Sequence, residues 1–395
     1  MELRNEPPAL RARERTAKAS ASRRVAVALA TALVAVALVA TFGLPQLRRT
    51  LVERVTTMCA DAETASACGR LEAAIETCSV ALAEIESPSA LQWDDDRDAE
   101  DELRVRLLRC RGVARKRLAN FDGALADFGA AQRLRPGRAE LAIDVADVQL
   151  SRHDFAGAIR EYTAVLEVDP RSARALCNRG AAKRFAGDVD GAVDDLDKSI
   201  ALDANLAHAH FNLGECHAAR GDYAAAEREF DASVAADDTN ADCRSSRGAL
   251  RLKCRRNADA ARDFDRAIEL APDRTHYLVL RATANLELDR AAARADLVSA
   301  IRRAPDDAFA RNVMAILDER EGRHAEALAG YGEAIRLDPG GARYWRNRAD
   351  LRLKRGDVPG ATSDARQAVA LDPRDEKSLA VLRRVESATD AADAR

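Results

Sequence analysis

Metal-ligating side chains gather most closely in one stretch, which contains His208, His210, Cys216 and His217. A zinc site needs side chains that converge on one point, and two histidines four residues apart on one helix face commonly provide this. No two of these histidines have that spacing on one face. We therefore expect helix packing and surface polarity from this stretch, and no metal site.

Catalytic motifs are also missing from the sequence, which contains no phosphate-binding glycine loop, HExxH or GxSxG. Adjacent carboxylates occur at Asp194-Asp195 and Asp306-Asp307. A catalytic pair needs a pocket that shifts one of the two pKa values, and a stack of helices offers no evident pocket. We expect no enzyme activity, no cofactor and no small-molecule substrate.

The charge distribution argues against nucleic acid as a ligand. The chain of 395 residues has a net charge of −3. Residues 1–24 carry +4, residues 25–44 carry no charge, and the rest of the chain carries −7. Binding nucleic acid requires a concentrated basic surface, which the main part of the chain lacks.

The eight cysteines show no CxxC or zinc-type spacing. Free cysteines are commonly buried as small apolar side chains, and we expect this for most of them. Cys59, Cys68 and Cys78 cluster in the sequence, and one pair among them could form a disulfide in an oxidising compartment.

Residues 25–44 are uncharged and long enough, at about 1.5 Å per residue, to span a hydrocarbon core of about 30 Å. A cleavable signal peptide is the alternative, but its apolar region is usually shorter. Seven basic residues precede the segment, so the positive-inside rule leaves residues 1–24 in the cytoplasm as a disordered basic tail. The remainder is expected across the membrane, in the periplasm if the source is bacterial.

A pattern of about 34 residues recurs eight times after residue 104. Gly or Ala stands at the 8th place of every unit, Ala at the 20th, and mostly a large apolar residue at the 24th. The units begin at Val105, Ala139, Ala173, Ala207, Ala241, Thr275, Ala308 and Ala342. Their 24th-place residues are Phe128, Tyr162, Leu196, Phe230, Phe264, Leu297, Tyr331 and Ala365.

The recurring columns predict two antiparallel helices per unit. Small residues let the helices approach closely, and the 24th side chain fills the space beside that contact. Glycines at the 15th place end the first helix where a left-handed residue is needed, and aspartates that follow can cap the second helix. These are Gly187, Gly221, Gly322 and Gly356, with Asp188, Asp222 and Asp357 as caps. Six of the eight units close with a proline.

This pattern resembles the tetratricopeptide repeat family over residues 105–373. The resemblance implies an all-α, right-handed superhelical solenoid with a concave groove that binds a peptide or protein partner. In the family register, His210 and His217 face the partner helix of their own pair. The unit from Thr275 departs from the pattern, because it is one residue short and lacks the turn glycine, so its turn at 287–291 is expected to be tighter or distorted.

The flanks of the array are expected to complete it. Residues 52–88 fit a divergent helix pair, and residues 89–104 are either an acidic spacer or the acidic first turn of the following helix. Residues 374–388 suit a capping helix, and residues 389–395 form a tail.

Groove-facing places of the family register supply the candidate partner contacts. Asparagines at the 6th place could bond an extended peptide backbone, with basic and aromatic side chains beside them. The candidates are Arg106, Arg109, Arg117, Asn178, Phe185, Phe211, Asn212, Phe309, Arg343, Arg346 and Asn347. Phe211 and Asn212 are the strongest of these, and exposed aromatics on a concave face would need a partner. The alternative is that these are ordinary solvated side chains.

The sequence thus predicts a single-pass membrane protein that presents a repeat scaffold to a protein or peptide partner, recruiting or assembling an envelope complex. The alternative is a structural or self-associating spacer without a peptide ligand. Partner, pathway and oligomeric state are not encoded in any motif.

Overall fold

A computed structural model of the chain describes Thr31, residues 44–86 and residues 97–393. This part of the chain consists of α-helices joined by short turns, without a β-strand. The chain divides into two compact units, Met1–Ala186 and Gly187–Arg395, and each is described by itself.

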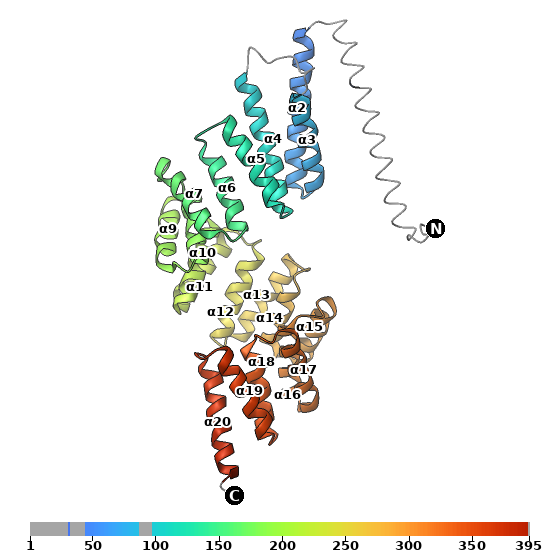
Figure 1. Cartoon of the computed structure of the whole chain (residues 1–395), viewed down its shortest axis with the longest axis vertical. Helices are drawn as coiled ribbons and strands as arrows, with labels where there is room; N and C mark the ends of the chain where they lie inside the picture. The colour runs from blue at the N-terminus through green and yellow to red at the C-terminus, as the bar shows by residue number, and fades with distance from the viewer. Residues whose placement is uncertain (1–30, 32–43, 87–96, 394–395) are drawn as a thin grey trace, which may run out of the picture. The chain divides into compact units, whose positions relative to one another are not determined.

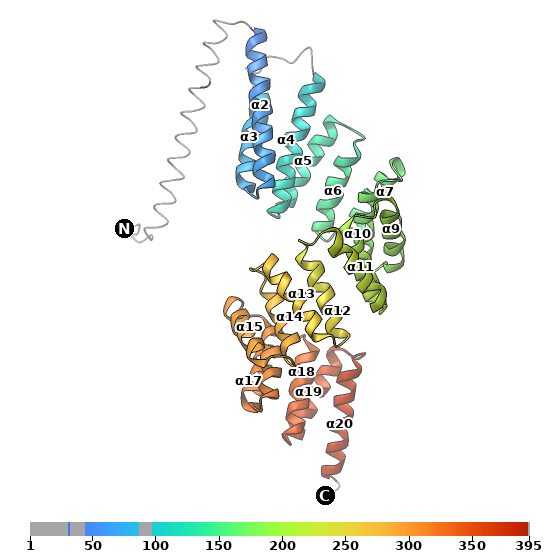
Figure 2. The same ribbon diagram turned by 180° about the vertical axis from the view of Figure 1, so that it is seen from behind.

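The first unit contains seven described helices, each packed against the next along the chain. α2 and α3 form an antiparallel pair, and α4 contacts both of them (Figures 1 and 2). The helices are α2 (Leu44–Ala67), α3 (Leu71–Glu86), α4 (Arg97–Arg117), α5 (Phe121–Leu134), α6 (Ala139–Ser151), α7 (Phe155–Val168) and α8 (Ala173–Phe185).

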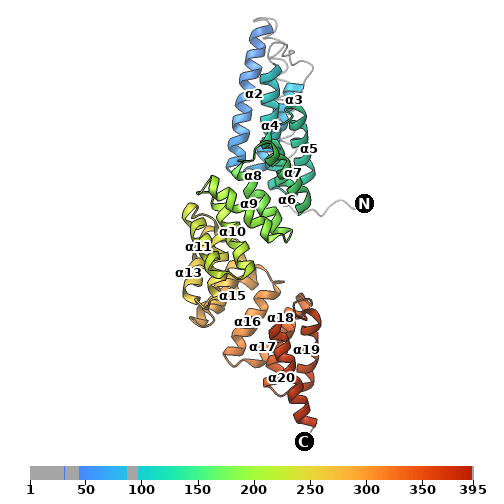
Figure 3. The same ribbon diagram turned by 90° about the vertical axis from the view of Figure 1, so that its left-hand side faces the viewer.

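The second unit continues with the same kind of helix pair. At its end, α20 packs on both α18 and α19 (Figure 3). The helices are α9 (Val189–Leu202), α10 (Ala207–Arg220), α11 (Tyr223–Ala236), α12 (Ala241–Lys253), α13 (Asn257–Leu270), α14 (Thr275–Asn285), α15 (Arg290–Arg303), α16 (Ala308–Arg320), α17 (His324–Leu337), α18 (Ala342–Lys354), α19 (Val358–Leu371) and α20 (Glu376–Asp393).

The small and large columns meet inside the helix pairs, as the sequence predicted. Every 24th-place side chain is at most 1% exposed. A Cβ atom at Gly248 would lie 2.8 Å from the Phe264 ring, and one at Gly214 would lie 2.7 Å from the Phe230 ring. Real Cβ atoms do not approach that closely, so glycine is needed where the facing ring belongs to phenylalanine.

In seven of the eight repeat units the turn between the two helices uses a left-handed residue at the 15th place. The four predicted glycines have φ between 78° and 89°. Three further units place Ala119, His153 and Arg255 there, with φ of 57°, 62° and 58°. L-residues pay a steric penalty in this conformation, so these three turns carry strain that the glycine turns avoid.

The predicted caps are confirmed by hydrogen bonds. Asp188, Asp222 and Asp357 each accept from the backbone N–H three residues later, at 2.9, 3.0 and 2.9 Å. Asn120 and Asp154 do the same for α5 and α7. Side-chain acceptors of this kind satisfy N–H groups that the first turn of a helix leaves unpaired.

The pair that starts at Thr275 differs, as its sequence indicated. Its first helix, α14, has 11 residues, against 13 or 14 in the first helices from α6 to α18. No left-handed residue follows α14, because Leu286 is right-handed and Asp289 is extended. Asp289 caps α15 through the N–H groups of Ala291 and Ala292, both at 3.0 Å.

Helices occupy both flanks of the repeat array. α2 and α3 pair over the region assigned to a divergent unit, and α20 covers the capping segment and continues through the tail to Asp393. Residues 97–104 are helical, so the spacer reading is wrong for them, and Asp98 and Glu100 lie in the first turn of α4. Carboxylates favour that position because the helix dipole is positive there.

Of the predicted anchor, residues 25–44, the structure describes Thr31 and Leu44, and the rest lies outside the described residues, as does the tail 1–24. No helix within the described ranges is sufficiently long and apolar to cross a membrane.

The expected burial of most cysteines is confirmed. Six are buried and two, Cys68 and Cys254, are exposed. Cys59, Cys78 and Cys110 belong to one apolar cluster. The spacing of the cysteines in the sequence did not suggest that Cys110 of α4 would join the other two. Helix pairing brings α3 against α4, and that contact is not visible from proximity along the chain.

Candidate partner-binding site

The three arginines predicted to offer a basic surface are bonded to neighbouring helices. Each reaches from α4 to α2 or to α6. The contacts are Arg106 Nη2 to Glu63 Oε1 at 2.9 Å, Arg109 Nε to Asp144 Oδ2 at 2.6 Å, and Arg117 Nη1 to the Ser66 carbonyl at 2.8 Å. These side chains therefore hold successive first helices together.

Asn178, predicted to bond a peptide, donates its amide to Asp147 at 2.9 Å. Asp147 also accepts from Arg174 at 2.9 Å and from the hydroxyl of Tyr162 at 2.5 Å. Burial and the Asp147 carboxylate raise the pKa of Tyr162 well above its usual range. Asp147 thus joins α6 to α7 and α8, and the Asn178 side chain is one of the donors that make this connection.

The candidates near the C-terminus show the same behaviour. Asn347 donates to Asn312 at 2.9 Å, and Arg346 donates to Asp375 at 2.8 Å. The Arg343 guanidinium carbon lies 5.7 Å from the centre of the Phe309 ring, a cation–π distance. Each of these contacts links one helix pair, or the capping helix α20, to its neighbour.

Phe211 and Asn212, the strongest candidates from the sequence, are mostly enclosed. Asn212 is 8% exposed and donates to the carbonyl of His208 at 2.8 Å. Phe211 is half-buried, with its ring centre 6.1 Å from that of Phe230. The expectation of exposed aromatics is thus wrong for Phe211, and also for Phe309, which is half-buried against the core of α14–α17.

Phe185 is the aromatic candidate that remains open, with 53% of its surface exposed. Its ring stacks on Phe155 of α7 with 5.5 Å between centres and 14° between planes. His153 meets Phe155 edge-on at 5.8 Å, and the Arg184 guanidinium lies 4.1 Å from the Phe185 ring centre. We call these four residues, His153, Phe155, Arg184 and Phe185, the aromatic patch.

A hollow of about 440 Å³ adjoins the aromatic patch and shares His153 with it. Leu125 of α5, Gln149 of α6 and the turn residues Arg152 and Asp154 complete its lining. The Gln149 Oε1 atom is buried and, within the described part of the chain, has no hydrogen-bond partner. A mostly polar lining with one unsatisfied acceptor can take a side chain that carries a hydrogen-bond donor.

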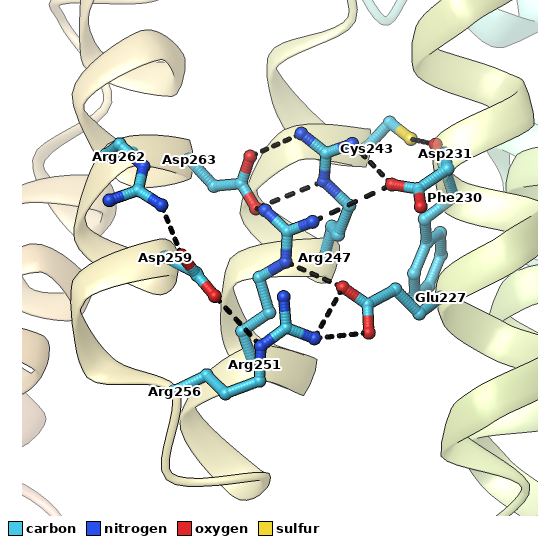
Figure 4. A network of polar contacts seen from close by, with 10 residues as sticks. All are labelled: Glu227, Phe230, Asp231, Cys243, Arg247, Arg251, Arg256, Asp259, Arg262 and Asp263. Carbon is cyan, nitrogen blue, oxygen red and sulfur yellow. Dashed lines mark hydrogen bonds and ion pairs between the residues drawn. The ribbon is translucent and has the colours of Figure 1, made fainter.

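A second set of polar contacts, between half-buried arginines and buried aspartates, was not predicted. Arg247 and Arg251 of α12 bind Asp263 of α13 at 2.5 and 2.7 Å (Figure 4). Their other nitrogens reach Asp231 and Glu227 of α11 at 2.7 and 2.9 Å. One carboxylate on α13 and two on α11 therefore neutralise the arginines of α12 between them.

The same arrangement recurs at equivalent places of other helix pairs. Burial lowers the pKa of Arg247, but its bonds to Asp263 and Asp231 outweigh burial and raise it; bonding to Asp296 likewise raises the pKa of Arg281. The other recurrences are Arg111 with Asp127 at 2.7 Å, Arg281 with Asp296 at 2.7 Å, and Arg348 with Asp364 at 2.8 Å.

A signal for this network was present in the sequence. Arginine at the 7th place always occurs with aspartate at the 23rd place, and the units without that arginine also lack the aspartate. The arginines are Arg111, Arg179, Arg247, Arg281 and Arg348, and the aspartates are Asp127, Asp195, Asp263, Asp296 and Asp364. Comparing columns in pairs would have found it.

The histidine stretch is engaged in packing contacts. His210 bonds Glu229 through Nδ1 at 2.7 Å and the Ala204 carbonyl through Nε2 at 3.1 Å. Within the described ranges, no group of three or more His, Cys, Asp or Glu side chains is arranged to hold a metal ion.

Helix pairs that meet at small residues, turn through a left-handed residue and stack on one another define a helical repeat protein. Two solved structures are similar in fold. A tetratricopeptide repeat protein from Parabacteroides merdae matches with a TM-score of 0.54 at 16% identity, over 63% of this chain and 98% of that one. The Cut9–Hcn1 hetero-tetramer of the APC/C matches with 0.56 at 11% identity, over 84% and 76%.

The sequence profile described as tetratricopeptide repeat matches residues 143–207, 177–241 and 312–376. These residues of the chain are therefore tetratricopeptide repeats. No curated protein matches it in sequence.

Proposed function

We propose that this chain is a membrane-anchored scaffold that binds a protein or peptide partner through the aromatic patch of its first unit. The observation that carries the proposal is Phe185, a phenylalanine with 53% of its surface exposed and stacked on a second ring. Water-exposed aromatic rings that are held rigid by a neighbour are typical anchors of protein interfaces.

The energetics favour this surface over the polar groove. Phe185 already has its orientation fixed by Phe155, so a partner that covers it loses little side-chain entropy. The hollow beside the patch has a mostly polar lining and supplies the Gln149 acceptor. A partner with a large side chain and an adjacent N–H donor fits both features.

The other predicted contact residues have a different part in this proposal. Asn178, Asn347 and Arg346 already bond the neighbouring helix pair. If one of these side chains gave up its present hydrogen bond to bind a peptide, the gain in binding free energy would be small, because the neighbouring residue would lose its own hydrogen-bond partner. In this proposal they hold the stack in register, and Phe185 contacts the partner.

The anchor is proposed from residues 25–44, whose length and lack of charge suit a membrane span. α2 begins at Leu44, the last residue of that segment, so a span would lead directly into the first helix pair. The excess of basic residues before it favours a cytoplasmic N-terminus and repeats on the far side. On that side the scaffold would recruit components of an envelope complex.

Partner binding can be tested with a photoreactive phenylalanine analogue at position 185 and, as a control, at Val168, which is 77% exposed in the same unit. We expect irradiation in native membranes to give a cross-linked product from position 185 and none from position 168. Phe185→Ala should lower partner affinity about 10- to 100-fold, as for an interface anchor worth roughly 2 kcal/mol.

Three outcomes decide the proposal. Equal cross-linking at both positions, or unchanged affinity after Phe185→Ala, would exclude the aromatic patch as the contact. A cross-linked product of twice the chain mass would favour the self-associating spacer instead.

The topology can be read from the two exposed cysteines, Cys68 and Cys254. A membrane-impermeant maleimide added to spheroplasts should label both without lysis if the repeats lie outside the inner membrane. Labelling that requires lysis would reverse the proposed orientation, whereas release of the labelled chain from the membrane would indicate a cleaved signal peptide.

A further inference from the structure

A second hollow, of about 360 Å³, lies among α3, α4 and α5 of the first unit. Half of its lining is leucine and alanine. The other half is polar and consists of Ser79, Glu86, Arg104, Arg111 and Arg133. Three guanidinium groups thus face one carboxylate beside apolar carbon. We call this cavity the basic hollow.

The arginine network of α12 shows which carboxylates surround the equivalent arginines elsewhere. Arg247 and Arg251 both bind Asp263 of α13 (Figure 4). They also reach Asp231 and Glu227 of α11. Two guanidinium groups of α12 therefore have carboxylate neighbours on both adjacent helices.

The same places in the first unit hold fewer carboxylates. Arg111 and Arg115 of α4 both bind Asp127 of α5, at 2.7 and 2.8 Å. On α3, the two places that carry carboxylates on α11 hold Ser79 and Ile75. The Arg111 Nη1 atom donates to the neutral Ser79 hydroxyl at 3.2 Å. Within the described residues, these two arginines therefore share a single carboxylate.

Arg104 and Arg133 bring further donors to the basic hollow. Arg104, Leu108 and Arg111 lie on one face of α4, since they are four and three residues apart. The Arg104 Nη2 atom binds Glu100 at 2.8 Å, but its Nε atom is buried and has no hydrogen-bond partner in the described part of the chain. Arg133 is exposed and forms no ion pair with a described residue. A bound anion would satisfy donors that the protein leaves unpaired.

We propose that the basic hollow binds a small acidic amphiphile, with one carboxylate or phosphate group on an aliphatic stem. The guanidinium groups of Arg104 and Arg133 bind the anion, because their planar donor arrangement matches both headgroups. The stem lies against the leucine and alanine side chains. The volume of about 360 Å³ suits such a molecule, because small-molecule sites commonly measure about 300–1,000 Å³. This site is separate from the partner contact proposed at Phe185.

The test uses the full chain in an uncharged maltoside detergent and a diazirine derivative of octanoate as the probe. After irradiation and digestion, peptide mapping should place the label on α3, α4 and α5 around the basic hollow. Octanoate and octyl phosphate should both compete with the probe, and the one that acts at the lower concentration identifies the headgroup. Octanol has the same stem without a charge and should compete at least about tenfold more weakly.

Two results would overturn the proposal. One is label spread over exposed apolar residues without enrichment at the basic hollow, and the other is equal competition by octanol. Because Phe185 belongs to another surface, neither result bears on the partner contact there. Failure of cross-linking at position 185 likewise leaves the basic hollow unaffected.

A substitution on α3 tests the electrostatic basis directly. Ser79→Asp supplies the carboxylate that α11 has at the equivalent place, and it should lower the affinity for the probe at least about tenfold by neutralising Arg111. Ser79→Asn is the matched control of the same size without the charge, and its affinity should stay within about threefold of the original. Equal affinities in the two variants would refute the role of charge.

A pair of exposed arginines provides the second comparison. Arg133→Ala should weaken probe binding about 5- to 10-fold, because it removes a charged donor from the basic hollow. Arg160→Ala on α7 removes an arginine that is likewise exposed and forms no ion pair with a described residue, and it should leave binding unchanged. Circular dichroism checks that each variant folds. Equal binding by both variants would exclude Arg133 from the site.

Discussion

The helix pairs α12–α13 and α16–α17 occupy the same register of the repeat but fill it with different side chains. Where α12–α13 has Arg247 opposite Asp263, the equivalent places of α16–α17 hold Met314 and Gly330. α12–α13 brings Gly248 against the ring of Phe264, whereas in α16–α17 it is Gly330 that approaches Ala315, with a built Cβ at 2.9 Å.

The two turns differ in the same way. The left-handed residue is Arg255 after α12, with φ of 58°, and Gly322 after α16, with φ of 78°. In these two pairs the backbone follows from close approach at one point and a left-handed turn, and charge at the 7th and 23rd places is an optional addition. The charges of α12–α13 supply contacts to α11, whereas α16 is joined to the preceding helix at another place, through Arg294 of α15 and Asp318 at 2.7 Å.

The largest expected effect comes from removing the buried carboxylate. Asp263→Asn leaves Arg247 and Arg251, whose side chains are 12% and 15% exposed, short of charge compensation. We expect a loss of about 3 kcal/mol in the local stability of α12–α13. Hydrogen exchange by mass spectrometry is the suitable measurement, because a repeat array need not unfold in one step.

A matched control exists on the same arginine. Asp231 also binds Arg247, but its side chain is 53% exposed. Asp231→Asn should cost less than about 1 kcal/mol, as for a solvated ion pair. Equal losses for the two variants would contradict the importance of burial in this network.

A smaller effect is expected at the point of close approach. Gly248→Ala places a Cβ against Phe264 and should cost about 1–2 kcal/mol, after allowing for the better helix propensity of alanine. Combining it with Phe264→Leu reproduces the Ala282–Leu297 pairing that α14–α15 uses. The double variant should then be less destabilised than the sum of the single variants.

The double-mutant cycle gives the check. Purely additive free energies would mean that the two positions do not compete for space. Ala315→Gly in α16–α17 serves as the reference in the opposite direction. It removes a buried methyl group from the cluster that contains Tyr331 and should cost about 1–2 kcal/mol from helix propensity and lost packing.

The smallest effects are expected at the turns. Arg255→Gly should stabilise α12–α13 by about 0.5–1 kcal/mol, because glycine relieves the left-handed strain but adds freedom to the unfolded chain. Gly322→Ala should destabilise α16–α17 by about 1 kcal/mol for the opposite reason. Shifts of the same sign at the two turns would disprove this account of the 15th place.

Sequence reasoning predicted the repeat because its signals are local and periodic. The columns that hold Gly214, Ala226 and Phe230 recur at nearly constant spacing, and each reports a contact inside one helix pair. The candidate site was harder to predict, because it depends on contacts between pairs. Asn178 and Asn347 occupy groove places, yet each bonds the neighbouring pair.

Phe185 illustrates the same difficulty from the other side. In the sequence it is one of three groove phenylalanines, and nothing local separates it from Phe211 or Phe309. The difference lies in what each ring meets. Phe211 lies beside Phe230 and Phe309 beside the α14–α17 core. Phe185 contacts the Phe155 ring and the Arg184 guanidinium, yet remains 53% exposed.

The sequence by itself determined the helix pair, its turn and its caps, because small residues, left-handed glycines and capping aspartates act on neighbours within one unit. The tertiary structure alone decided which polar side chains meet across units, that Cys110 joins Cys59 and Cys78 in one apolar cluster, and which aromatic ring remains exposed. Those outcomes depend on how one pair stacks on the next, and that geometry brings together residues about one repeat apart.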